Sequence, residues 1–149
     1  MADDCCAGSG DVMILACSGC SNLGQLANQA AVELTQEGFG RMFCLAGIGG
    51  QLSGFVQSAK DAPVMVAIDG CPVGCAKAVL KQAKVPLKNY LVVTGEGIEK
   101  SRNLNLPRAD IDRVKEAVKR VVSGQASSGI RPFAGSCGCA SCSTDKSGS

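Results

Sequence analysis

The chain has 149 residues, of which 46% are hydrophobic and 19% charged, a composition that fits one globular domain and excludes a disordered charged chain. Lys and Arg total 15 against 13 Asp and Glu, so the formal net charge is only +2 and nucleic acid is not expected as a partner. The chain has ten Cys and no His, which excludes His-dependent triads and His metal sites. Any catalytic or metal-binding chemistry must therefore rely on thiols, carboxylates and lysines.

Strand-like and helix-like sequence patterns alternate through the middle of the chain and define an α/β domain (11–123). An N-terminal arm (1–10) precedes this domain, and a flexible tail rich in Ser, Gly and Cys (124–149) follows it. Apolar runs predict four strands, at about 12–17, 41–45, 63–69 and 89–94. Helical spacing predicts helices at about 21–37, 52–60, 72–84 and 109–122. Strands that alternate with helices indicate crossover units and a four-stranded parallel sheet. We therefore expect a three-layer α/β/α sandwich, flavodoxin-like or Rossmann-like.

Three local features of this domain carry further expectations. The glycine-rich run 46–50 is expected to be a turn, because it lacks the lysine of a phosphate-binding P-loop. Pro72 favours the first helical position, which would put Cys71 at the N-cap of that helix. In the last helix, Lys115 is expected to face water with the other charged side chains.

The cysteines indicate a reducing compartment. The first apolar run follows Asp3, Asp4 and Asp11 rather than a basic segment, so it does not match an export signal. No run reaches the roughly 18 to 20 apolar residues of a membrane span, so no membrane partner is expected. We expect a cytoplasmic protein, in which clustered Cys indicate metal or redox chemistry rather than structural disulfides.

Five of the thiols follow the predicted strands. Cys17 ends the first strand with Cys20 three residues on, Cys44 lies near the end of the second, and Cys71 and Cys75 follow the third. Because the carboxyl ends of parallel strands share one edge of a sheet, these thiols should converge there. Four of them suit a tetrahedral thiolate site for zinc or iron, with Cys20 as a spare thiol. The alternative for Cys44 is a small residue of the core.

Two other residues are candidates for supporting roles. Asp69 would support the ligands, act as a general acid or base, or only cap the following turn. Lys100 would face the same edge and offset thiolate charge, or be a solvated surface residue. A phosphatase loop of the Cys-x5-Arg type is excluded, since Leu23 stands where its arginine belongs.

Several segments together resemble the DGC-domain family, named for its Asp-Gly-Cys motif. They are Cys17-Ser18-Gly19 with Ser21 and Gly24-Gln25, the segment 44–50, Asp69-Gly70-Cys71-Pro72 with Cys75, and the segment 97–100. The resemblance covers about residues 11–122. Members of that family are described as zinc-binding proteins in which four cysteines hold the metal. By match, those four are Cys17, Cys44, Cys71 and Cys75.

Three functions follow from these observations. The first is zinc binding by the four thiolates, a closed shell that favours a structural, sensing or storage role over catalysis. The second is a thiol oxidoreductase or sulfur carrier in which Cys71 attacks and Cys75 or Cys20 resolves. The third is an iron–sulfur cluster or another soft metal in the same site. Cysteines outside this set, Cys5 with Cys6 and the tail residues Cys137, Cys139 and Cys142, would form a second metal site or supply resolving thiols.

Overall fold

The computed structural model describes residues 12–124, so the predicted arm, nearly all of the predicted tail and the cysteines in them lie outside the described residues. The elements follow along the chain as β1 (Val12–Ala16), α1 (Asn22–Gln36), β2 (Arg41–Met42), α2 (Leu45–Gly49), α3 (Ser53–Asp61), β3 (Val64–Asp69), α4 (Cys75–Gln82), β4 (Asn89–Val92), the 3₁₀ helix η1 (Val93–Glu96) and α5 (Arg108–Ser123).

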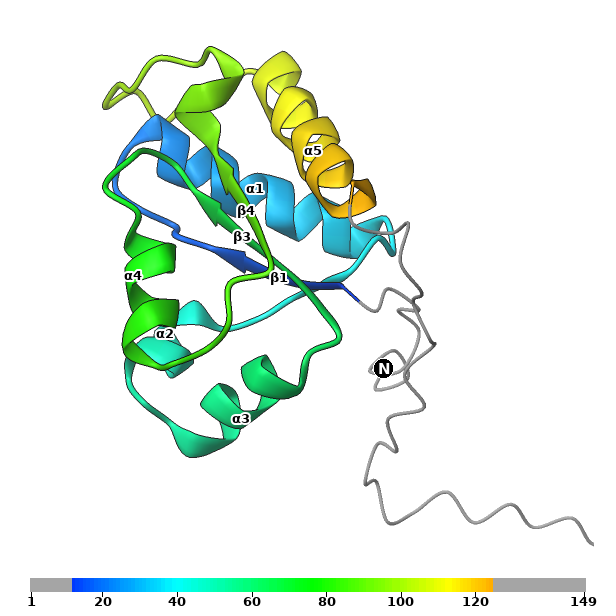
Figure 1. Ribbon diagram of the computed structural model, residues 1–149. Coiled ribbons are helices and arrows are strands. Elements are labelled where there is room, and N and C mark those ends of the chain that lie inside the picture. Colours follow the sequence, from blue (N-terminus) through cyan, green and yellow to red (C-terminus); the bar gives the residue numbers. More distant parts are fainter. Residues whose placement is uncertain (1–11, 125–149) are drawn as a thin grey trace, which may run out of the picture.

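The strands form one sheet in the order β2-β1-β3-β4, and every neighbouring pair is parallel. Helices α1 and α5 cover one face of this sheet, and α2, α3 and α4 cover the other (Figure 1). The predicted three-layer α/β/α sandwich with a four-stranded parallel sheet is confirmed. Because all four strands point the same way, the loops that follow them gather on one edge, as expected for this class of fold.

Each face of the sheet has its own apolar cluster, since successive residues of a strand point to opposite sides. Ile14 of β1 and Ile68 of β3 pack against α1 and α5, whereas Leu15 and Met65 pack against the opposite layer. The predicted apolar face of α1 is confirmed, because all of its members are fully buried: Leu23, Leu26, Ala27, Ala30 and Leu34. Burying a side chain the size of Leu contributes about 1.5–3 kcal/mol, so these contacts fix the two layers on the sheet.

The region of the predicted second strand differs from expectation. Strand β2 contains only Arg41 and Met42, and the glycine-rich run predicted as a turn forms the short helix α2. Cys44 is the N-cap of α2, where its sulfur accepts a hydrogen bond from the backbone N–H of Gly47 at 3.3 Å. This cap supplies an acceptor to the first turn and begins a helix that the glycines alone do not predict.

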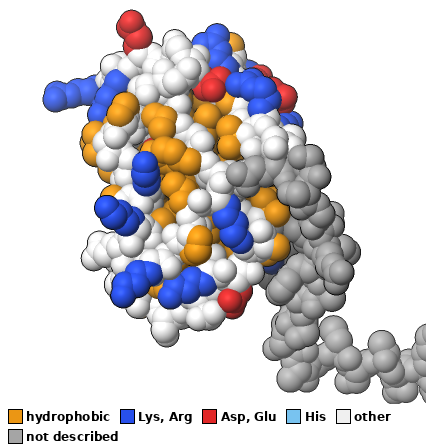
Figure 2. Space-filling view, viewed as in Figure 1, with side chains coloured by type: hydrophobic (Ala, Val, Ile, Leu, Met, Phe, Trp, Pro, Cys, Tyr) orange, Lys and Arg blue, Asp and Glu red, His pale blue; other side chains and the backbone are white. Residues whose placement is uncertain are grey.

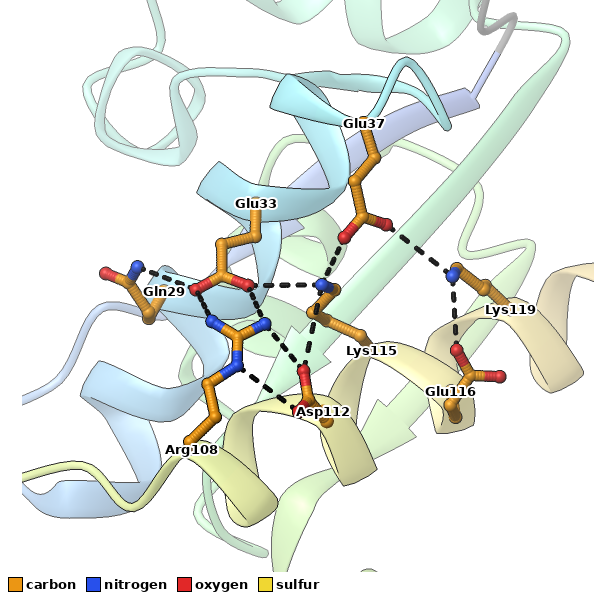
Figure 3. Close-up of polar contacts among 8 residues, drawn as sticks. All are labelled: Gln29, Glu33, Glu37, Arg108, Asp112, Lys115, Glu116 and Lys119. Carbon is orange, nitrogen blue, oxygen red and sulfur yellow. Dashed lines mark hydrogen bonds and ion pairs between the residues drawn. The ribbon is translucent and has the colours of Figure 1, made fainter.

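A network of ion pairs joins α1 to α5 (Figure 3). Glu33 of α1 accepts two hydrogen bonds from the Arg108 guanidinium, both at 2.8 Å. Lys115 of α5 contacts Glu33 and Glu37, and its side chain is only 7% exposed. The expectation that Lys115 faces water is therefore wrong, because acidic residues of α1 pair with its ammonium group at the helix contact.

Charged side chains form ion pairs on α5 and also surround an apolar band on the surface (Figure 2). Helix α5 forms ion pairs with residues of α1 and η1 and also within the helix itself. Figure 2 shows one face of the molecule, on which Lys and Arg side chains surround a central band of hydrophobic side chains and acidic side chains are few. Among residues 12–124, no helix combines the length and the apolar character needed to cross a bilayer.

Candidate thiol site at the carboxyl edge of the sheet

Cys17 joins the ends of the two central strands. It follows β1 directly, and its backbone N–H donates to the carbonyl of Ile68 at 3.0 Å. Its sulfur accepts a hydrogen bond from the backbone N–H of Gly70 at 3.3 Å. The thiol of Cys17 is thus held against the Asp-Gly-Cys segment that follows β3, although the two lie 53 positions apart in the sequence.

Backbone segments approach one another closely beside this thiol. A Cβ atom on Gly70 would lie 2.8 Å from the backbone nitrogen of Gly24, and a Cβ atom on Gly24 would lie 2.5 Å from that of Gly19. The side-chain amide of Gln25 donates to the carbonyl of Gly19 at 2.9 Å. Glycine is required at these contacts because any side chain would push the segments apart. The first turn of α1 is therefore packed between the loops that carry Cys17 and Cys71.

Asp69 determines where α4 begins. Its carboxylate is 1% exposed and accepts hydrogen bonds from the backbone N–H groups of Ala76 at 2.8 Å and Lys77 at 3.1 Å. The residue before the helix is Gly74, which has φ 70° and no side chain to cap it. Asp69 thus supplies the cap from seven residues upstream. Of the roles considered for Asp69, capping is the one that these contacts show.

This cap corrects the expectation that the helix starts at Pro72 with Cys71 at its N-cap. Helix α4 starts at Cys75, and residues 71–74 form a turn closed by a hydrogen bond from the Gly74 N–H to the Cys71 carbonyl at 3.1 Å. The preference of Pro72 for a first helical position is overridden because the Asp69 oxygens bind the N–H groups of Ala76 and Lys77 instead. The two cysteines lie before and at the start of the helix, not on one helical face.

The remaining thiols differ in exposure. Cys71 is half-buried, and the Lys100 ammonium group lies 3.6 Å from its sulfur. Cys20, Cys44 and Cys75 are exposed. Lys100 therefore lies at the same edge as Cys71 and supplies positive charge next to it.

Tyr90 belongs to this edge as well, and the sequence reasoning missed it. Its hydroxyl donates to the second carboxylate oxygen of Asp69 at 3.0 Å. Burial raises the pKa of Tyr90 to about 12, helped by the hydrogen bond to Asp69 and by negative charge on Asp69, Cys17 and Cys71. The available signal in the sequence was that Tyr90 is the single tyrosine of the chain and lies in a predicted strand. Its position beside Asp69 follows only from the strand order, which the sequence did not predict.

Comparison with known proteins gives the family. The model of the DGC domain matches residues 13–118, from β1 into α5. This chain belongs to the DGC-domain family. It is similar to the anaerobic and virulence modulator AnvM of Pseudomonas aeruginosa, with 32% identity over 111 residues that make up 74% of this chain and 85% of AnvM. No solved structure matches this DGC-domain chain.

Whether this DGC domain fits a metal ion depends on its donor groups and their arrangement. Each of the cysteines predicted as ligands is a free thiol, and the chemistry of four thiols suits zinc. Contacts join Cys17, through Gly70, to the segment of Cys71, whereas Cys44 caps α2 and Cys75 is the first residue of α4. Within residues 12–124, no three acidic or Cys side chains are grouped closely enough to share an ion. The donor types therefore fit zinc, and binding would require side chains to reorient.

Proposed function

We propose that this DGC-domain protein is a cytoplasmic metal-binding protein that holds zinc through Cys17, Cys44, Cys71 and Cys75. Its role is structural, sensing or storage rather than catalytic, because four thiolates close the coordination shell and leave no position for a substrate. When bound, the metal would crosslink the loops that follow β1, β2 and β3. The relative AnvM is named as a modulator, and a non-enzymatic role agrees with that name.

One observation carries the proposal: three of the four sulfurs have a hydrogen-bond donor directed at them. Gly70 donates its backbone N–H to Cys17 at 3.3 Å, Gly47 donates its backbone N–H to Cys44 at 3.3 Å, and the Lys100 ammonium lies 3.6 Å from Cys71. A donor at the sulfur stabilises the negative charge that a thiolate ligand carries, and such contacts tune thiolate metal sites. The contacts of Cys17 and Cys71 join residues far apart in the sequence, whereas the contact of Cys44 is the local cap of α2.

The test is the zinc content of full-length protein purified without oxygen. We expect about one zinc per chain, its loss in the single variants Cys71→Ser and Cys75→Ser, and retention in Cys20→Ser. Cys20→Ser is the matched control because Cys20 is exposed, as Cys75 is. Equal loss of zinc in Cys20→Ser would contradict the ligand assignment. Zinc-free wild-type protein would contradict the function, and visible absorbance with bound iron would replace it by an iron–sulfur cluster.

The cysteines of the tail need a separate control. A full-length variant in which Cys137, Cys139 and Cys142 are all Ser should keep the same zinc content if the metal is held at the edge of the sheet. Loss of one equivalent in this variant, with no loss in Cys71→Ser, would move the site to the tail.

A second candidate function is thiol–disulfide exchange, favoured by the contact between Lys100 and the half-buried Cys71. The Cys71 thiolate would attack one sulfur of a substrate disulfide, break that bond and release the other sulfur as a thiolate. Cys75 or Cys20 would then attack the mixed disulfide, which frees the second substrate thiol and leaves an intramolecular disulfide. In a Cys75→Ser variant the mixed disulfide should persist and be visible by mass spectrometry, and Cys20→Ser tests the other resolving thiol.

A further inference from the structure

We infer that Tyr90, acting through Asp69, is a positioning residue for the thiols of Cys71 and Cys75. The inference rests on the proposed function only in assigning a role to those thiols. Tyr90 lies in β4 beside β3, with Ala67 as its partner in the register, and its hydroxyl donates to Asp69 at 3.0 Å. Asp69 is the last residue of β3, directly before the segment that carries both cysteines.

The Asp69 carboxylate distributes its contacts between its two oxygens. Oδ1 accepts from the N–H of Ala76 at 2.8 Å, and Oδ2 accepts from the N–H of Lys77 at 3.1 Å and from the hydroxyl of Tyr90 at 3.0 Å. Two of these donors belong to the first turn of α4 and the third to β4, so together they hold a carboxylate that is 1% exposed between the helix and the sheet. Without the tyrosine hydroxyl, the carboxylate would keep the two N–H donors of α4 and lose its hydrogen bond to β4, so its position relative to the sheet would be held less firmly. Both cysteines would be affected, because Cys71 follows Asp69 by two residues and Cys75 precedes the capped Ala76.

The tyrosine hydroxyl also lies close to the segment between the two cysteines. A Cβ atom on Gly74 would lie 3.5 Å from the tyrosine hydroxyl oxygen, so the space beside this glycine faces Tyr90. The ammonium group of Lys77 lies over the Tyr90 ring, 5.4 Å from its centre. Lys77 therefore contacts Tyr90 through its side chain and Asp69 through its backbone. Lys77, Tyr90 and Asp69 thus all contact one another at the start of α4.

A purely structural role for Tyr90 would give a different result from a positioning role. Loss of a buried hydrogen bond lowers stability wherever it lies, whereas loss of a positioning contact changes the thiols beside it. Glu33→Gln is the control, because it weakens hydrogen bonds and ion pairs between α1 and α5 that do not involve the thiols. A comparison of this variant with Tyr90→Phe separates the two effects.

The experiment uses full-length, metal-free protein and measures the alkylation rate of each cysteine with iodoacetamide by peptide mass spectrometry. For Tyr90→Phe we expect several-fold changes in the rates of Cys71 and Cys75 and no change at Cys20. Asp69→Asn should change the same two rates more strongly, and Glu33→Gln should change none of them. Wild-type rates in Tyr90→Phe, or the same changes in Glu33→Gln, would overturn the inference.

Zinc affinity gives a second readout that separates this inference from the proposed function. A positioning residue of a metal site typically accounts for about 10-fold to 100-fold in affinity, so Tyr90→Phe should weaken zinc binding by that factor. If the wild-type chain binds no zinc, the proposed function fails while the alkylation rates alone still decide the role of Tyr90. If zinc binds equally in wild type and Tyr90→Phe with unchanged rates, the positioning role is refuted and the proposed function stands.

Discussion

Replacing Gly24 by Ala tests the close packing of the thiol loop against α1, because two considerations give opposite signs. Alanine is favoured over glycine in a helix by about 1 kcal/mol, so the sequence alone predicts a stabilised protein. In the structure, the added Cβ would lie 2.5 Å, 2.6 Å and 2.7 Å from the backbone N, O and Cα atoms of Gly19. These are backbone atoms, so the loop after Cys17 would have to move. Overpacking of this kind costs up to about 3 kcal/mol, which leaves a net loss of about 2 kcal/mol.

The assay is equilibrium unfolding in urea together with thermal unfolding. At about 4 °C per kcal/mol for a domain of this size, Gly24→Ala should lower the midpoint temperature by about 8 °C. Gly54→Ala is the control, since Gly54 also lies in the first turn of a helix but has no atom within 4 Å of its Cβ position. Gly54→Ala should raise the midpoint by up to about 4 °C. A Gly24→Ala variant as stable as the wild type would refute the close approach of the loop.

Three further predictions concern single groups. Hydrogen bonds from Arg108 and Gln29 lower the pKa of Glu33 from 4.5 to about 2, so the stability that this carboxylate contributes is present above pH 4.5 and is lost as the pH falls toward 2. Glu33→Gln should remove that part of the pH dependence in urea titrations at several pH values. The single tyrosine should ionise near pH 12 in a spectrophotometric titration, and Asp69→Asn should move its pKa toward 10, because it removes a negative charge. Gly47→Ala should destabilise the protein by about 1–3 kcal/mol in urea, since its Cβ would lie 2.6 Å from the Phe55 ring.

The sequence predicted the layers and the sheet because those depend on patterns that repeat locally. Each strand long enough to cross the core has an apolar run, and the apolar face of α1 recurs at helical spacing. Where the prediction failed, a contact distant in sequence decided the local structure. Asp69 delays the start of α4 to Cys75, and the acidic residues of α1 draw Lys115 inward. A pattern read along one segment does not contain those partners.

Part of the candidate site was likewise predictable from the sequence, and part was not. The contact between the loop of Cys17 and the segment of Cys71 was predictable, since parallel strands share a carboxyl edge, whereas the convergence of all the thiols stays a prediction. The contact of Tyr90 with Asp69 was not, because it requires β4 to pair with β3, and strand order cannot be obtained from apolar runs. The close approach of Gly24 to Gly19 was equally hidden, because a glycine in a helical pattern is compatible with an open surface as well as with a close contact.

Among the proposed ligands, Cys44 separates the two candidate functions most directly. A thiolate metal site needs its sulfur, whereas exchange between Cys71 and Cys75 or Cys20 does not. Cys44→Ser should leave the fold intact, because serine is a favoured N-cap and can accept the hydrogen bond that Gly47 now donates to sulfur. Loss of zinc in a folded Cys44→Ser variant would therefore be loss of a ligand. Full disulfide exchange in the same variant, with no metal in the wild type, would assign the edge to thiol chemistry and leave Cys44 as a cap of α2.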